Sequence, residues 1–138
     1  MVAGEELDVD ALLRSTTLQA DGSWRRGEGA GKSGRRGFAY SGILIKLGSG
    51  QDHPFDEQEH IAAEYMEANE QALKALCAFP GVSDSFLGLQ FSVEIDSSIV
   101  GTCFSISPRL MRIAGEVGIK VTVYLDLDRQ DWGTEDPE

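Results

Sequence analysis

Two ten-residue segments of this chain alternate strictly between apolar and polar side chains. In LGLQFSVEID, residues 87–96, the odd-numbered positions are apolar, and IKVTVYLDLD, residues 119–128, has the same pattern. A period of two is typical of strands in a sheet with one face against the core and the other toward water. We therefore expect the following residues to be buried beneath helices: Leu89, Phe91, Val93, Val121, Val123 and Leu125.

Helical signals lie on either side of the first alternating segment. Residues 54–79 carry apolar side chains at helical spacing, and Pro80 follows them. A second helix is expected over 108–117, because Ser107 is a suitable N-cap and Gly118 suits the exit. A shorter helix is expected to begin at Asp8.

Two further segments, 37–47 and 98–107, are more continuously apolar and are predicted to be strands. The order from 37 to 128 is then strand, helix, strand, strand, helix, strand. This βαββαβ order predicts an α+β, ferredoxin-like core with both helices on one face. In that fold the strands 87–96 and 119–128 are the two edges and lie far apart. Their acidic residues are then interpreted as charges that protect sheet edges, not as a cation site.

The length and composition indicate one globular domain. The 138 residues are 41% hydrophobic and 25% charged. We divide them into an N-terminal helix and basic loop (1–36), the core (37–128) and an acidic tail (129–138). No apolar run approaches the roughly 20 residues needed to cross a bilayer, and the acidic start is unlike a secretory signal. Cys77 and Cys103 are expected to be buried free thiols, so we predict a cytoplasmic protein.

The segment SWRRGEGAGKSGRRG, residues 23–37, holds five of the twelve Lys and Arg residues. A phosphate-binding P-loop is disfavoured, because Arg26 stands where the motif needs a glycine and no helix follows. A nucleic-acid site built on Trp24 and the arginines is a second interpretation. The net charge of −11 opposes it, since the rest of the chain is more acidic still. The third interpretation is a mobile connector, which glycine favours.

Four stretches together resemble the bacterial domain-of-unknown-function 4279 family: GEELDVDALL, SWRRGEG, FSISPRLMRIAGEVGI and VTVYLDL. The matching positions are Trp24, Arg25, Arg26, Gly27, Ser107, Pro108, Leu110, Gly118 and Ile119. The resemblance implies no activity. It implies that Trp24 and Arg25 are more than loop filler, with Trp24 as an anchor of the loop. Members of that family begin with a full strand where this sequence has only Met1 to Ala3, so we expect an incomplete sheet edge.

Catalytic patterns are not visible in the sequence. His53 and His60 are not spaced with a nucleophile or with enough ligands for a metal, so no metal and no cofactor are predicted. We therefore expect a non-enzymatic binding module with a protein partner. The alternative is a small-molecule or nucleic-acid binder that uses Trp24 and the Arg/Gly loop. The candidate binding residues are Trp24, Arg25, Arg26, Arg35, Arg36 and Tyr124.

Overall fold

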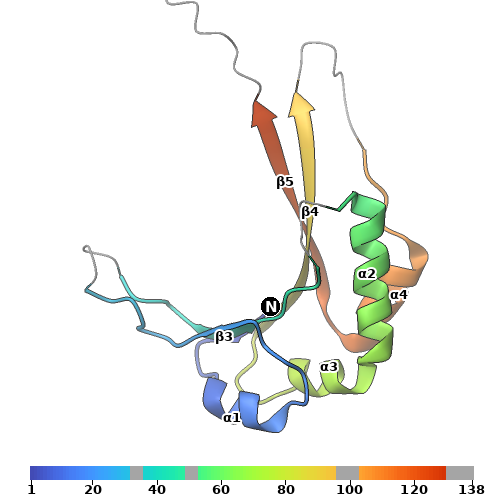
Figure 1. The fold of residues 1–138 in the computed structure, drawn as a ribbon. Helices are drawn as coiled ribbons and strands as arrows, with labels where there is room; N and C mark the ends of the chain where they lie inside the picture. The colour runs from blue at the N-terminus through green and yellow to red at the C-terminus, as the bar shows by residue number, and fades with distance from the viewer. Residues whose placement is uncertain (32–35, 49–52, 96–102, 130–138) are drawn as a thin grey trace, which may run out of the picture.

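The computed structural model describes residues 1–31, 36–48, 53–95 and 103–129 (Figure 1). The described residues form an α+β domain, as predicted, with one five-stranded mixed sheet and four helices. The elements in chain order are β1 (Val2–Gly4), α1 (Val9–Ser15), β2 (Gly22–Trp24), β3 (Ser41–Leu44), α2 (Phe55–Ala68), α3 (Glu70–Cys77), β4 (Asp84–Ile95), α4 (Pro108–Val117) and β5 (Lys120–Arg129).

The strand order is β2-β3-β1-β4-β5, which differs from the ferredoxin-like order. The alternating segments are not two distant edges. They form β4 and β5, which pair in parallel along their length, with Leu89 opposite Val123 and Glu94 opposite Asp128. The other pairings are antiparallel. α4 is therefore the crossover that parallel neighbouring strands require.

The two continuously apolar segments were predicted less well. Of 37–47, only Ser41–Leu44 is a strand, and a strand that was not expected, β2, pairs with it. Of 98–107, the described part, 103–107, is not a strand, and the rest lies outside the described residues. A short apolar run is compatible with a buried strand or with a buried helix segment, so periodicity alone does not identify the secondary structure.

The strand at the centre of the sheet is short. β1 has three residues and lies between β3 and β4, so Val2 is opposite both Ile43 and Ser85. β1 is therefore the middle strand of the sheet, whereas the resemblance led us to expect an incomplete edge.

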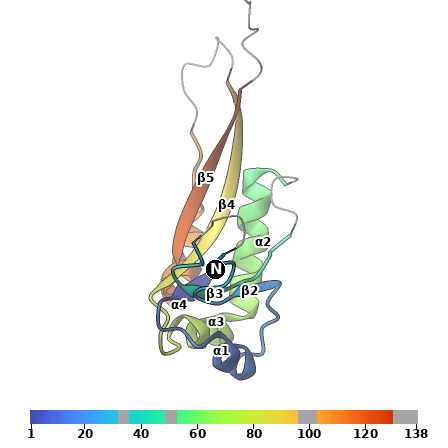
Figure 2. The same cartoon turned by 90° about the vertical axis from the view of Figure 1, so that its left-hand side faces the viewer.

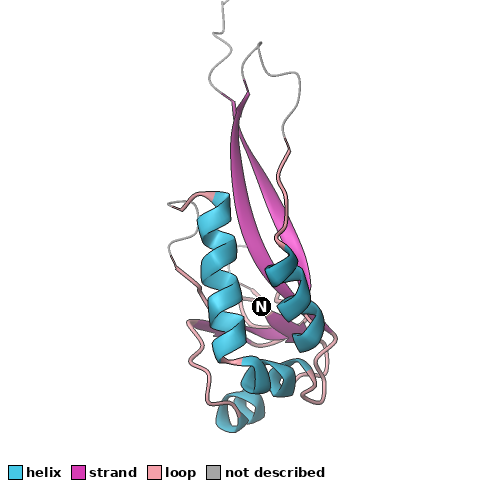
Figure 3. Cartoon of the chain, turned by 90° about the vertical axis from the view of Figure 1, so that its right-hand side faces the viewer, coloured by secondary structure: helices cyan, strands magenta, loops and turns pink. Residues whose placement is uncertain are grey.

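Two helices cover one face of the β4–β5 ribbon (Figures 1 and 3). α4 has the predicted bounds: the Ser107 hydroxyl accepts the Leu110 N–H at 3.2 Å, and Gly118 has φ 84°. The single helix expected over 54–79 is two helices, α2 and α3. At the break, the Asn69 side-chain amide donates to the Tyr65 carbonyl at 2.8 Å, a local bond that competes with the helical ladder.

The β4–β5 ribbon extends well beyond the ends of these helices (Figures 2 and 3). Where the helices cover it, Leu87 and Leu89 are buried as predicted. Leu125 is 52% exposed, so the prediction that it is buried is wrong. Cys103 is likewise exposed, not buried. None of the described helices has the length and apolar character needed to span a membrane.

Candidate binding slot in the centre of the sheet

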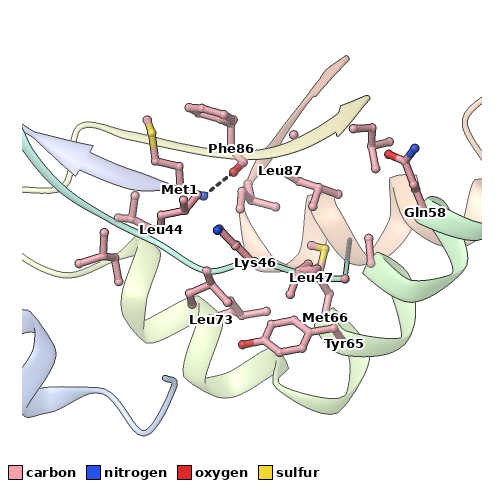
Figure 4. Close-up of a pocket in the computed structure, with 18 of the residues that line it drawn as sticks. Met1, Leu44, Lys46, Leu47, Gln58, Tyr65, Met66, Leu73, Phe86 and Leu87 are labelled. Atoms are coloured by element: carbon pink, nitrogen blue, oxygen red, sulfur yellow. Dashed lines mark hydrogen bonds between the residues drawn. The ribbon is translucent and has the colours of Figure 1, made fainter. Parts of the chain in front are cut away.

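A cavity of about 610 Å³ opens between two extended segments of the chain (Figure 4). One wall is residues 44–48, which continue from β3, and the other is residues 86–90 of β4. The floor is apolar and includes Met66 of α2 and Leu73 of α3. We call this cavity the slot.

The slot lies in line with β1. β1 separates β3 from β4, and both flanking segments run on past its first residue. Since neighbouring strands lie about 4.8 Å apart, two segments that flank a third are about 10 Å apart. The slot therefore occupies the position of one strand between two others.

The β4 wall presents backbone groups to the slot. The Phe86 N–H donates to the Met1 carbonyl, and the Met1 amino group donates to the Phe86 carbonyl, each at 2.9 Å. Backbone groups of a strand turn to alternate sides, so those of Gly88 point the same way as those of Phe86. Within the described part of the chain, no group accepts from the Gly88 N–H or donates to its carbonyl on this side.

The opposite wall, residues 44–48, also presents backbone groups to the slot. The Leu44 carbonyl accepts from the Asp21 N–H at 2.8 Å, and the Lys46 N–H donates to the Asp21 carboxylate at 2.6 Å. Both bonds point away from the slot, toward the β2 side of the sheet. The backbone groups of Ile45, which lies between these residues, therefore point into the slot.

Gln58 of α2 closes the far end of the slot. Its side-chain amide donates to the Gln90 carbonyl at 2.7 Å and accepts the Gln90 N–H at 2.9 Å. It also donates to the His53 carbonyl at 2.9 Å. A carboxamide that bonds both backbone groups of one residue has the same donor and acceptor as the backbone of a paired strand. Gln58 thus supplies to β4 the hydrogen-bond donor and acceptor that the backbone of a neighbouring strand would supply.

The side chains of the slot favour an uncharged, largely apolar ligand. Burial raises the pKa of Tyr65 and of the Cys77 thiol, both of which line it, so each stays protonated at neutral pH. At the rim, the Tyr124 ring lies over Gly88 and 6.4 Å from the Phe86 ring, measured between centroids. This arrangement suits the binding of a largely apolar ligand.

Tyr124 is the predicted binding residue that the structure places at the slot. Trp24 lies on β2, at the opposite edge of the sheet from β5, so the two do not form one site. The Trp24 ring packs on Gly42, where an added Cβ would collide with it, and lies 6.2 Å from the Phe38 ring and 6.3 Å from the Tyr40 ring. This packing agrees with the anchor interpretation.

The arginines beside Trp24 contact carboxylates of the same chain. Arg25 pairs with Asp10 at 2.5 Å and with Glu28 at 3.6 Å, and Arg26 approaches Glu6 at 3.8 Å. Arg36 is exposed, and Arg35 lies outside the described residues. Residues 32–35 are also those on which the phosphate-binding and mobile-loop interpretations depend, so both stay predictions.

The histidines engage separate partners. His53 contacts Glu57 at 3.0 Å, whereas His60 contacts Glu64 at 3.4 Å and Arg109 at 3.2 Å. Nowhere in the described ranges do three or more His, Cys, Asp or Glu side chains lie together in a way that could hold a metal ion.

Sequence reasoning missed Gln58, Ile45 and the backbone of Gly88. Gly88 carries one signal: it is the one glycine within the alternating segment 87–96, and glycine in a strand marks a place where another group approaches the backbone. Comparison with protein-family models, with curated proteins and with solved structures finds no match to this chain.

Proposed function

We propose that this chain is a non-enzymatic binding module that takes a segment of a partner protein into the slot. The observation that carries the proposal is the pair of facing walls with backbone donors and acceptors directed into the cavity. A small apolar molecule would fill the floor but leave these groups without partners. A polypeptide supplies both backbone hydrogen bonds and apolar side chains.

Energetics support this ligand class. A backbone hydrogen bond that replaces bonds to water contributes about 0.5–1.5 kcal/mol net. Gly88 is exposed and Ile45 is half-buried, and both lie beside an apolar floor, so a peptide adds the burial of apolar side chains to its backbone hydrogen bonds. A ligand that satisfies them gains affinity from groups already in position, with little cost of ordering.

Charge supports a partner whose segment is flanked by basic residues. The net charge of −11 attracts cations at long range and accelerates their association, an effect that salt weakens. The free thiols Cys77 and Cys103 support a cytoplasmic setting, where thiols stay reduced. The resemblance to the domain-of-unknown-function 4279 family belongs to the same proposal and assigns no activity.

The test is peptide binding before and after the slot is filled. Leu47 lines the slot and is half-buried, so Leu47→Trp should occupy the cavity and leave the fold intact. Met111→Trp on the outer surface of α4, where Met111 is 57% exposed, is the matched control. Peptides selected from a random display library on the wild-type chain should lose at least tenfold in affinity on Leu47→Trp and bind Met111→Trp normally. Selected peptides that ignore Leu47→Trp, or no selected peptide at all, would contradict the proposal.

The nucleic-acid alternative is the weaker proposal. Its arginines, Arg25 and Arg26, are each paired with carboxylates of this chain, so a phosphate would have to compete with those contacts. Binding of a single-stranded oligonucleotide at low salt, lost on Arg25→Ala and Arg26→Ala together, would support it.

A further inference from the structure

We infer that the partner segment enters the slot as an extended β-strand in line with β1, antiparallel to β3 and β4, and displaces the Gln58 amide from Gln90. The inference rests on the proposed function and gives the form of the ligand and its register. Addition of a strand between two open backbone edges is a recognised mode of peptide capture.

The register follows from β1. Val2 lies opposite Ser85 on one side and opposite Ile43 on the other. A strand that continues the same line places four residues opposite Leu87, Gly88, Leu89 and Gln90 in turn. The residue opposite Gly88 then meets its free N–H and carbonyl, and the residue opposite Gln90 meets the groups that Gln58 now holds.

The side-chain pattern of the ligand follows from the same register. Residues directly opposite each other in a sheet turn their side chains to the same face. Leu87 and Leu89 face the helices and are buried, so the ligand residues opposite them point to the floor and must be apolar. The residues opposite Gly88 and Gln90 point to the open face beside Tyr124, where polar side chains are tolerated.

The position of Gln58 makes it a competitor of the strand. Its amide holds the last pair of backbone groups that the strand needs, so both hydrogen bonds must break before the strand can pair with Gln90. Removing the amide should therefore tighten binding. A residue that contacted the ligand directly would have the opposite effect.

The experiment uses a defined probe on the full chain. The peptide is a fluorescein-labelled heptamer in which valine alternates with threonine between terminal lysines. Its control is the same peptide N-methylated at alternate amides, so that the edge facing β4 cannot donate. We expect the first peptide to bind, and the N-methylated peptide to lose binding at least thirtyfold in fluorescence anisotropy. Equal binding of the two peptides would overturn strand addition and leave the proposed function standing as apolar filling of the slot.

Gln58→Ala supplies the second arm, with Gln71→Ala on the exposed surface of α3 as the control. We expect Gln58→Ala to bind the alternating peptide roughly tenfold more tightly, since two competing hydrogen bonds are removed. Gln71→Ala should bind as wild type does. Unchanged or weaker binding to a folded Gln58→Ala chain would overturn the displacement of Gln58.

A fusion separates failure of the inference from failure of the proposed function. Four residues, threonine and valine alternating with valine last, are placed directly before Met1, where they can reach the slot in register. The melting temperature should rise, and the added peptide should no longer bind. A serine-glycine fusion of the same length should do neither. If the valine fusion has no effect and selected peptides still require the slot, the strand register is wrong; if no peptide binds at all, the proposed function fails as well.

Discussion

The Trp24 corner and the slot are both places where a short strand of the sheet meets a connecting segment, yet they differ in what their polar groups contact. At the Trp24 corner, aromatic rings pack together and Arg25 and Arg26 meet carboxylates of the same chain. At the slot, backbone groups of Gly88 and Ile45 face a cavity, and Gln58 substitutes for a strand. The conspicuous sequence motif thus forms a contact within the domain, and the proposed binding surface is formed by ordinary strand residues.

The largest effect that separates the two regions is expected for Trp24→Ala. The ring packs on Gly42 and two neighbouring aromatic rings, and replacing a buried aromatic residue with alanine typically costs about 3–5 kcal/mol. Trp24 is half-buried, so we expect a loss of about 3 kcal/mol in the free energy of unfolding, measured by urea denaturation.

The control for Trp24 is Phe38→Ala, since Phe38 is 51% exposed and should cost much less. Peptide affinity measured at a temperature where Trp24→Ala remains folded should be unchanged. A Trp24→Ala chain that unfolds at the wild-type urea concentration but no longer binds peptide would reverse the roles assigned to the two regions.

A second, smaller contrast concerns the two thiols. Cys77 is half-buried beside the slot and burial raises its pKa, so little of it is thiolate at neutral pH, whereas Cys103 is exposed. We expect a disulfide reagent such as Ellman's to modify Cys103 at least tenfold faster than Cys77. The Cys103→Ser variant isolates the slower reaction, which bound peptide should slow further. Cys77 reacting as fast with peptide as without it would place the ligand elsewhere.

The parts of the fold that were predicted correctly are those with strong local signals. Ser107 and Gly118 set the ends of α4, and Leu87 and Leu89 fixed the inner face of β4. Pairing depends on long-range contacts that local signals do not encode, so the parallel pairing of β4 with β5 was missed. β1 is too short for a period of two to be visible.

The candidate site was predicted only at Tyr124. Trp24, Arg25 and Arg26 attracted attention because their side chains are distinctive, whereas the slot is made by backbone groups that every residue has. A strand position left open between two others becomes visible only when the sheet order is known. Gln58 illustrates this limit, because its role depends on Gln90, which is 32 positions away in the sequence.

The smallest expected effect is electrostatic. Arg25 lowers the pKa of Asp10 through a hydrogen bond and through its charge. A carboxyl whose folded-state pKa is lowered contributes stability above its unfolded pKa, and this is lost as pH falls through the folded value. NMR titration of Arg25→Ala should therefore show the pKa of Asp10 higher than in wild type. The variant should lose less stability than wild type on acidification, while its peptide affinity stays unchanged. An unshifted Asp10 pKa would mean that the pair does not form in solution.

Amide hydrogen exchange at Gly88, followed by NMR, tests the central claim most directly. In the free chain the Gly88 N–H should exchange much faster than those of Leu87 and Leu89, whose backbone groups turn toward β5. On addition of the alternating valine-threonine peptide, Gly88 exchange should slow at least tenfold, to the range of its neighbours. A Gly88 amide already protected like Leu87 and Leu89 in the free chain, or one whose exchange the bound peptide leaves unchanged, would contradict an open strand position in the sheet.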